Sequence, residues 1–123
     1  MNKEIMSQEL ESLIRILDFI QEEQTFIKRK LSSLLENIVV SDVLIWAEVL
    51  HQEILNRETA LQLLKNDILV FRNQLKTTKL VGNIIDSNSL LIFKKYKEQV
   101  GYIEGEFFTW KQVTNEKFET ALN

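Results

Sequence analysis

The feature that most constrains this chain is the spacing of its apolar residues, which recur at alternating intervals of three and four. One stripe runs through residues 4–38 with Gln24 as its only polar member, and a second runs through residues 43–79 with Arg57 as its only polar member. This heptad spacing is typical of long helices that pack against each other along one face. The apolar members are Met6, Leu10, Leu13, Leu17, Ile20, Ile27, Leu31, Leu34 and Ile38 in the first stripe, and Val43, Ala47, Leu50, Ile54, Leu61, Leu64, Ile68, Phe71 and Leu75 in the second.

The composition also favours helices, because the chain has no Pro and only three Gly. A sheet-rich fold needs a turn about every ten residues, and Gly and Pro supply many of those turns. The chain has no Cys, which removes disulfides and thiolate metal sites and fits a reducing compartment. We therefore expect an all-α fold with a single domain over residues 1–123 and helices at about 4–38, 42–79 and 87–121.

The first two helices are expected to form a long antiparallel hairpin, because only a few residues separate the two stripes. One register then places every member of the first stripe opposite a member of the second. It runs from Ile38 opposite Val43 beside the connection to Met6 opposite Leu75 at the far end. This complementarity predicts a coiled-coil-like seam.

The same register places the two polar members, Gln24 and Arg57, in one layer. Arg57 could donate to the Gln24 amide oxygen or reach Glu22 or Glu23. Such a layer lowers stability but can fix the register, so Arg57→Leu is expected to raise the melting temperature while loosening the pairing. The alternative is that both residues lie at the solvent edge and share a layer by chance.

The third helix is predicted to follow a loop at residues 82–83 and a start at residues 86–89. Gly101 and Gly105 lie inside it, four residues apart, and indicate a bend or a point of close packing. Its stripe is expected to weaken beyond Trp110 to Thr114 and Lys117, with Val113 and Phe118 alongside. The stripe itself consists of Phe93, Tyr96, Val100, Ile103, Phe107 and Trp110.

Surplus apolar residues lie on the first two helices, away from the predicted seam. Phe19 and Phe26 are seven residues apart on the first helix, and Val49, Leu63 and Val70 repeat at helical spacing on the second. One further helix can hardly cover both faces, so these five residues are candidate interface positions. Two arrangements remain open, a compact three-helix bundle with apolar residues at its edge or self-association as a dimer, and the recurrent spacing favours the dimer.

Residues that could carry chemistry are few, since His51 is the only His. Glu48 and His51 match the Glu-x-x-His spacing of di-iron helical bundles, but a full site needs a second such motif and two further Glu residues. Only a two-fold dimer could supply the second motif. The three Gly form no phosphate-binding loop. We therefore expect no catalytic residues, no cofactor and, apart from the weak candidates Glu48 and His51, no metal site.

The charges are balanced along the chain, with 15 basic and 18 acidic residues and a net charge of −3. This balance disfavours nucleic acid and anionic membranes as partners. The first residues lack the apolar core of a signal peptide, and no stretch is apolar enough to span a bilayer. The sequence therefore favours a cytoplasmic protein.

Together these features predict a non-catalytic helical scaffold or adaptor, which acts through protein–protein contacts and self-association. The alternative is a helical bundle that binds a ligand or a metal. Its site would be a pocket near the third helix or the Glu48/His51 motif across a dimer.

Overall fold

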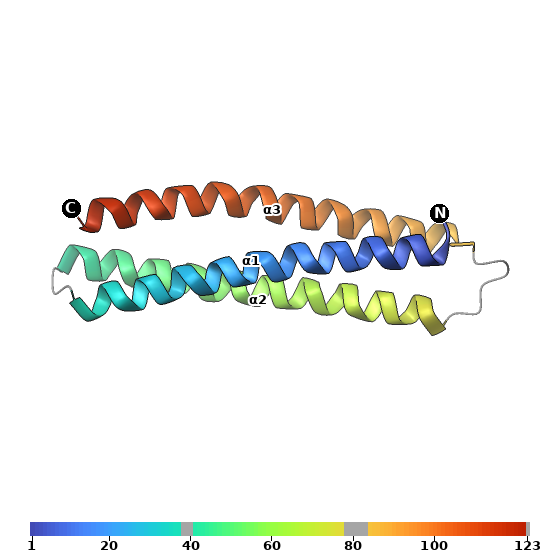
Figure 1. Ribbon diagram of the computed structural model, residues 1–123, viewed down its shortest axis with the longest axis horizontal. Coiled ribbons are helices and arrows are strands. Elements are labelled where there is room, and N and C mark those ends of the chain that lie inside the picture. The colour runs from blue at the N-terminus through green and yellow to red at the C-terminus, as the bar shows by residue number, and fades with distance from the viewer. Residues whose placement is uncertain (38–40, 78–83, 123) are drawn as a thin grey trace.

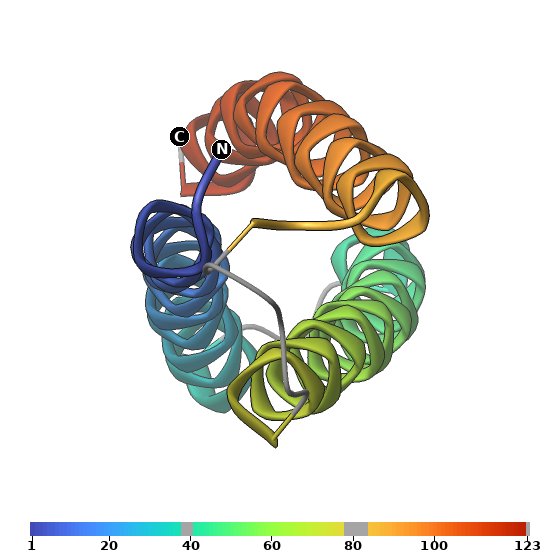
Figure 2. The same ribbon diagram turned by 90° about the vertical axis from the view of Figure 1, so that its right-hand side faces the viewer.

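The protein is a bundle of three long helices in the computed structural model, which describes residues 1–37, 41–77 and 84–122. The helices are α1 (Lys3–Asn37), α2 (Ser41–Thr77) and α3 (Ser87–Leu122). Figure 1 shows α2 running antiparallel to α1, while α3 runs parallel to α1 on the other side of the bundle. Viewed along the bundle, the helices form a triangle (Figure 2). The prediction of an all-α hairpin with a third helix is confirmed.

Each helix begins within one residue of its predicted start. The predicted ends at residues 38 and 79 lie outside the described residues, as do Ile38 of the first stripe and the predicted loop at residues 82–83. The long, uninterrupted helices follow from the absence of Pro and from stripes that bury one side of each helix.

The two predicted stripes form the seam between α1 and α2. Every described member of the α1 stripe is buried, and so is every apolar α2 member from Ala47 to Leu75, while Val43 and the polar member Arg57 are half-buried. Burial of each Leu or Ile side chain stabilises the fold by about 1.5–3 kcal/mol relative to exposure. The seam is therefore the main source of stability in the hairpin.

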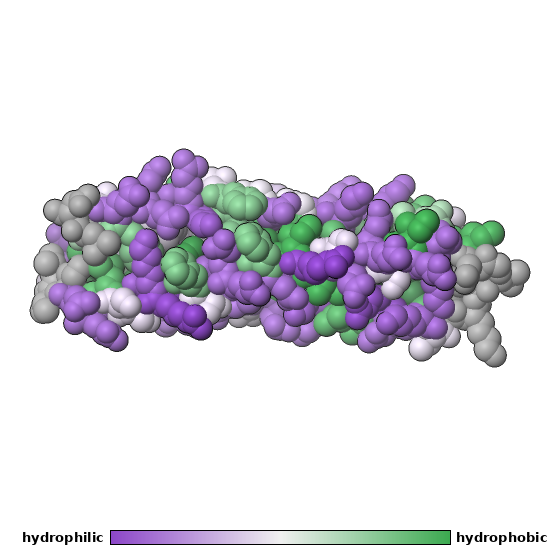
Figure 3. All heavy atoms as spheres, in the orientation of Figure 1, coloured by the Kyte–Doolittle hydropathy of each residue, from purple (hydrophilic) through white to green (hydrophobic). Residues whose placement is uncertain are grey.

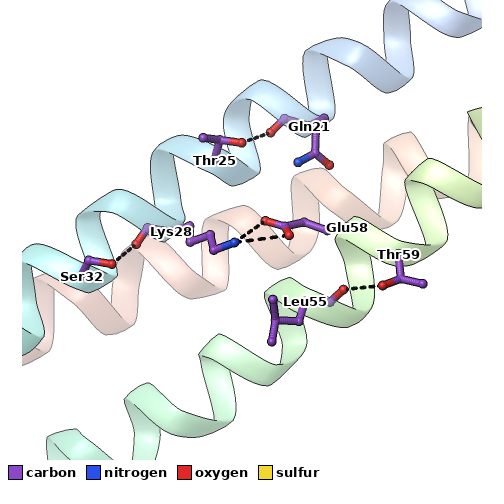
Figure 4. Close-up of polar contacts among 7 residues, drawn as sticks. All are labelled: Gln21, Thr25, Lys28, Ser32, Leu55, Glu58 and Thr59. Atoms are coloured by element: carbon purple, nitrogen blue, oxygen red, sulfur yellow. Dashed lines mark hydrogen bonds and ion pairs between the residues drawn. The ribbon is translucent and has the colours of Figure 1, made fainter.

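Ion pairs flank the seam between α1 and α2 and agree with the antiparallel order. The Lys28 ammonium lies 3.2 Å from a Glu58 carboxylate oxygen, as Figure 4 shows. Lys65 donates to Asp18 at 2.5 Å nearer the other end of the hairpin. All four side chains are partly exposed, so each ion pair contributes at most about 1 kcal/mol to stability. Its main effect is on the alignment of α1 with α2.

The apolar stripe of α3 continues further than predicted. Phe93, Val100 and Phe107 are buried, and the stripe then passes through Thr114 and Phe118, which are also buried. Thr114 lies on the stripe as expected, but the expectation of Lys117 as its next member is wrong, because Lys117 is exposed and Phe118 is buried in its place. Phe118 packs where α3 meets the end of the hairpin. Its ring lies edge-on to that of Trp46 with the ring centroids 5.2 Å apart, and the Lys30 ammonium lies 4.9 Å from the Phe118 ring centroid.

The two glycines of α3 do not form a close packing point within the described bundle. Gly101 and Gly105 are exposed, and a Cβ at either position would meet no atom within 4 Å. α3 also continues as one helix through both glycines and follows a smooth arc without a sharp bend (Figure 1). The expectation of a bend or a close neighbour at these residues is therefore wrong for the single chain.

Side-chain caps fix the starts of α1 and α3 at the same end of the bundle. The backbone N–H of Ile5 donates to Asn2 Oδ1 at 2.8 Å, and that of Ser89 donates to Asp86 Oδ1 at 2.6 Å. The bond from Ser89 stabilises the carboxylate and lowers the pKa of Asp86 below its usual 3.8. A β-bridge between Asn2 and Ile84 holds the two starts side by side.

Candidate functional site

All five interface residues predicted from the sequence are exposed in the single chain. Phe19, Phe26, Val49, Leu63 and Val70 keep between 47% and 64% of their side-chain surface accessible. Exposed apolar residues are ordinary when they are scattered, but these recur at helical spacing on two helices. They form two separate candidate surfaces, one on α1 and one on α2.

The first surface, here called the α1/α3 face, combines Phe19 and Phe26 of α1 with Phe108 of α3. Glu23 lies between the two α1 residues in sequence and pairs with Lys111 at 3.2 Å, three residues beyond Phe108. The ion pair thereby brings the exposed Phe side chains of the two helices to the same part of the bundle. Figure 3 shows hydrophobic patches among hydrophilic side chains on the side where α1 and α3 are seen in Figure 1.

The second surface, here called the α2/α3 seam, contains two grooves that are lined by residues of α2 and α3. A groove of about 630 Å³ lies beside Leu63, with Tyr102 and Ile103 on the α3 side. A groove of about 730 Å³ lies beside Trp46, with Val113 and Ala121 on the α3 side. Val49, Leu63 and Val70 are exposed apolar residues on one side of α2, with the polar Asn56 between Val49 and Leu63, and Leu63 also lines the first groove.

Mixed charges surround the groove beside Leu63. Asp67 of α2 and Lys95 and Glu98 of α3 all contribute to its lining. Tyr96 lies next to this groove and packs against Phe71 with ring centroids 5.7 Å apart. Burial raises the pKa of the Tyr96 hydroxyl, and the negative charge of Asp67 raises it further.

A polar cluster joins α2 to α3 along the bundle between the two grooves. Arg57 Nη1 donates to Glu106 Oε2 at 3.2 Å, and Nη2 donates to the other oxygen of the same carboxylate. The guanidinium also lies 4.4 Å from the Trp110 ring centroid, and the Trp110 indole donates to Glu53 at 3.0 Å. This cluster is a bidentate ion pair combined with a cation–π contact.

The cluster corrects the predicted bond between Gln24 and Arg57. Arg57 binds α3 rather than Gln24, Glu22 or Glu23, because its long side chain reaches the carboxylate of Glu106. Gln24 is 1% exposed, and its Nε2 has no hydrogen-bond partner. The pairing of Arg57 with α3 was not predicted from the sequence, although Glu106 and Trp110 are four residues apart on α3 and so share one side of that helix.

The candidate metal ligands predicted from the sequence lie close together on one helix but without further ligands beside them. Glu48 and His51 are both exposed on α2. Within residues 1–37, 41–77 and 84–122, no group of three or more His, Asp or Glu side chains is arranged to hold a metal ion. The motif therefore contributes at most two ligands from one chain.

Comparisons with known proteins assign no family to the chain: no protein-family model, curated protein or solved structure matches it. For the part of the chain that the structure describes, no helix has the combined length and apolar character that crossing a bilayer requires. Functional inference therefore rests on the two surfaces and on the physical chemistry of their residues.

Proposed function

We propose that this protein is a non-catalytic, cytoplasmic helical scaffold that self-associates through the α1/α3 face and holds a partner helix on the α2/α3 seam. The exposure of five apolar side chains at helical spacing on two helices carries this proposal. Full burial of such a Phe, Leu or Val side chain contributes about 1.5–3 kcal/mol. A few of them at a contact can therefore supply most of the energy of a specific complex.

The shape of the α2/α3 seam supports the binding of a partner helix there. Val49, Leu63 and Val70 are exposed on one side of α2, and the grooves beside Leu63 and Trp46 lie between α2 and α3. An amphipathic helix binds such a surface by placing its own apolar residues in the grooves. The mixed charges at the groove rims favour a partner helix with both acidic and basic residues.

Sedimentation velocity over a range of concentrations tests the self-association. The wild type is expected to sediment as a dimer, and replacing both Phe19 and Phe26 by Ser should shift it to the monomer. A matched control replaces Leu63 and Val70 by Ser, which removes exposed apolar residues from the other surface and should leave the dimer intact. A wild type that remains monomeric at every concentration would contradict the proposal, and dissociation by the control would contradict the assignment of faces.

The alternative of a ligand-binding bundle keeps one specific observation in its favour, the groove of about 730 Å³ beside Trp46. An apolar ligand in this groove would contact the indole directly. Titration with the fluorescent probe anilinonaphthalene sulfonate, with Trp46→Phe as the control, tests it through saturable binding. Binding that is unsaturable or indifferent to the substitution would exclude this groove. The Glu48/His51 metal site has only its sequence spacing in support, and metal analysis of the purified protein tests it.

A further inference from the structure

We propose that a second copy of this chain packs antiparallel on the outer face of α3, about a two-fold axis at Gly105. This inference rests on the proposed self-association and specifies its register. It extends the contact surface from Phe108 across α3 to Tyr102, which also lines the groove beside Leu63. The outer face is the exposed strip of α3 opposite its buried stripe, between Leu91 and Glu119. At a rise of 1.5 Å per residue, the strip is about 42 Å long.

The middle of the outer face has exposed aromatic residues on both sides of a residue without a side chain. Tyr102 is 75% exposed and Phe108 is 49% exposed, and they are each three residues from Gly105. A Cβ at Gly101 or Gly105 would meet open space, so nothing inside the described bundle requires glycine there. Glycine in a helix interior lowers helix stability relative to alanine. A second helix crossing at Gly105 gives these residues a role, because it can approach the backbone closely.

The sequence of the outer face is complementary to itself about Gly105. In the antiparallel register centred on that residue, Tyr102 lies opposite the partner's Phe108, and Phe108 lies opposite the partner's Tyr102. Each aromatic residue thus meets another aromatic residue, and such a pair stabilises a contact by more than the burial of its surface area alone. Gly105 lies opposite its own copy, and Gly101 lies opposite the partner's Thr109, so small side chains meet at both positions.

The charges of the outer face select the antiparallel direction. Its N-terminal part carries Lys94, Lys95 and Glu98, and its C-terminal part carries Glu116 and Glu119, all of them exposed, so the two parts have opposite net charge. The register at Gly105 places Lys94 opposite the partner's Glu116, and the two-fold axis forms this pair twice. A parallel arrangement would bring like charges together, which disfavours it. The face therefore fits a second copy of the chain in one orientation.

The dimer also explains the exposed residues on α1. Phe19 and Phe26 lie on the α1/α3 face, on the side of α1 that adjoins Phe108 through the Glu23–Lys111 pair. Because Phe108 belongs to both the outer face and the α1/α3 face, we expect the second copy to extend from α3 onto these α1 residues. An isologous interface of this kind buries the same residues on both copies.

Disulfide cross-linking tests the register, because the chain has no Cys and single cysteines can be placed freely. Gly105→Cys should form a covalent dimer under mild oxidation. Gln112→Cys alone should not, because the two copies of this residue lie on opposite sides of the axis, about 21 Å apart along the helices. A mixture of Glu98→Cys and Gln112→Cys chains should cross-link, since the register places these two positions opposite each other.

Charge reversal provides a test that adds no thiol near the axis. Lys94→Glu should weaken the dimer about tenfold, because it turns two attractive pairs into two repulsive ones. The double variant Lys94→Glu/Glu116→Lys should restore the wild-type dissociation constant. Lys97→Glu is the matched control: it makes the same charge change one turn away, outside the outer face, and should weaken the dimer less.

The outcomes separate this inference from the proposed function. A wild-type dimer that shows neither the Gly105→Cys cross-link nor the rescue by charge exchange would overturn the register and leave self-association standing. Preferential cross-linking of Gln112→Cys to itself would indicate a different register and would also overturn it. A monomeric wild type would overturn both proposals. The Gly105→Cys cross-link together with charge rescue would support both.

Discussion

Replacing Gln24 by Leu should stabilise the protein. Gln24 is 1% exposed within an otherwise apolar stripe, and its Nε2 has no hydrogen-bond partner. A buried donor without a partner costs about 1–3 kcal/mol relative to its hydrated state. Leu has a similar size, so it removes this cost without leaving a large cavity. We expect the free energy of unfolding to rise by about 1–3 kcal/mol, and the melting temperature by about 3–5 °C for each kcal/mol.

Urea unfolding followed by circular dichroism at 222 nm measures this change, with the protein concentration held constant because a dimer links stability to concentration. Gln24→Ala is the control, since it removes the same amide but leaves a cavity, and it should be less stable than Gln24→Leu by about 2–5 kcal/mol. A Gln24→Leu variant as stable as the wild type, or less stable, would refute the reasoning. That result would mean that the amide of Gln24 is fully hydrogen-bonded in the folded protein.

Three further predictions concern other parts of the bundle. Arg57→Met loses the contacts with Glu106 and Trp110, so it should lower the free energy of unfolding by about 1 kcal/mol in urea titrations. An increase would contradict this and would agree instead with the sequence-based expectation that removing the charge of Arg57 stabilises the fold. Asp86 has a lowered pKa, so its charge stabilises the fold above its usual pKa of 3.8, and this contribution is lost as the pH falls through the lowered value. The difference in melting temperature between wild type and Asp86→Asn should therefore shrink below about pH 3.8, and a constant difference would contradict the assignment. Phe118→Ala should destabilise the protein by about 3–5 kcal/mol in urea unfolding, and a loss under 1 kcal/mol would show that the end of α3 is not part of the core.

The hairpin could be predicted from the sequence because its stripes are nearly free of polar residues. A heptad stripe specifies which side of a helix is buried, and all described members of the α1 stripe are indeed buried. The end of α3 was harder to predict, because Phe118 rather than Lys117 continues the core beyond Thr114. Which of these two adjacent residues is buried depends on the neighbouring helices, which the periodicity of a single helix does not describe.

The candidate surfaces could be predicted only in part, for a related reason. The exposure of Phe19 and Val49 follows from their position on the helix, which points away from the hairpin seam. The grooves depend on how far α3 lies from α2, and no sequence spacing encodes that separation. The partner of Arg57 depended on the reach of a long, flexible side chain, which can bond to either neighbouring helix.

Static light scattering of the purified chain, measured over a wide range of concentrations, tests the central claim of self-association most directly. The chain has a mass of 14.5 kDa, and we predict that the measured mass rises with concentration to twice that value and then stays constant. A plateau at two chains is the result expected of a closed two-fold interface. A mass that remains at 14.5 kDa up to the highest concentration would contradict the claim.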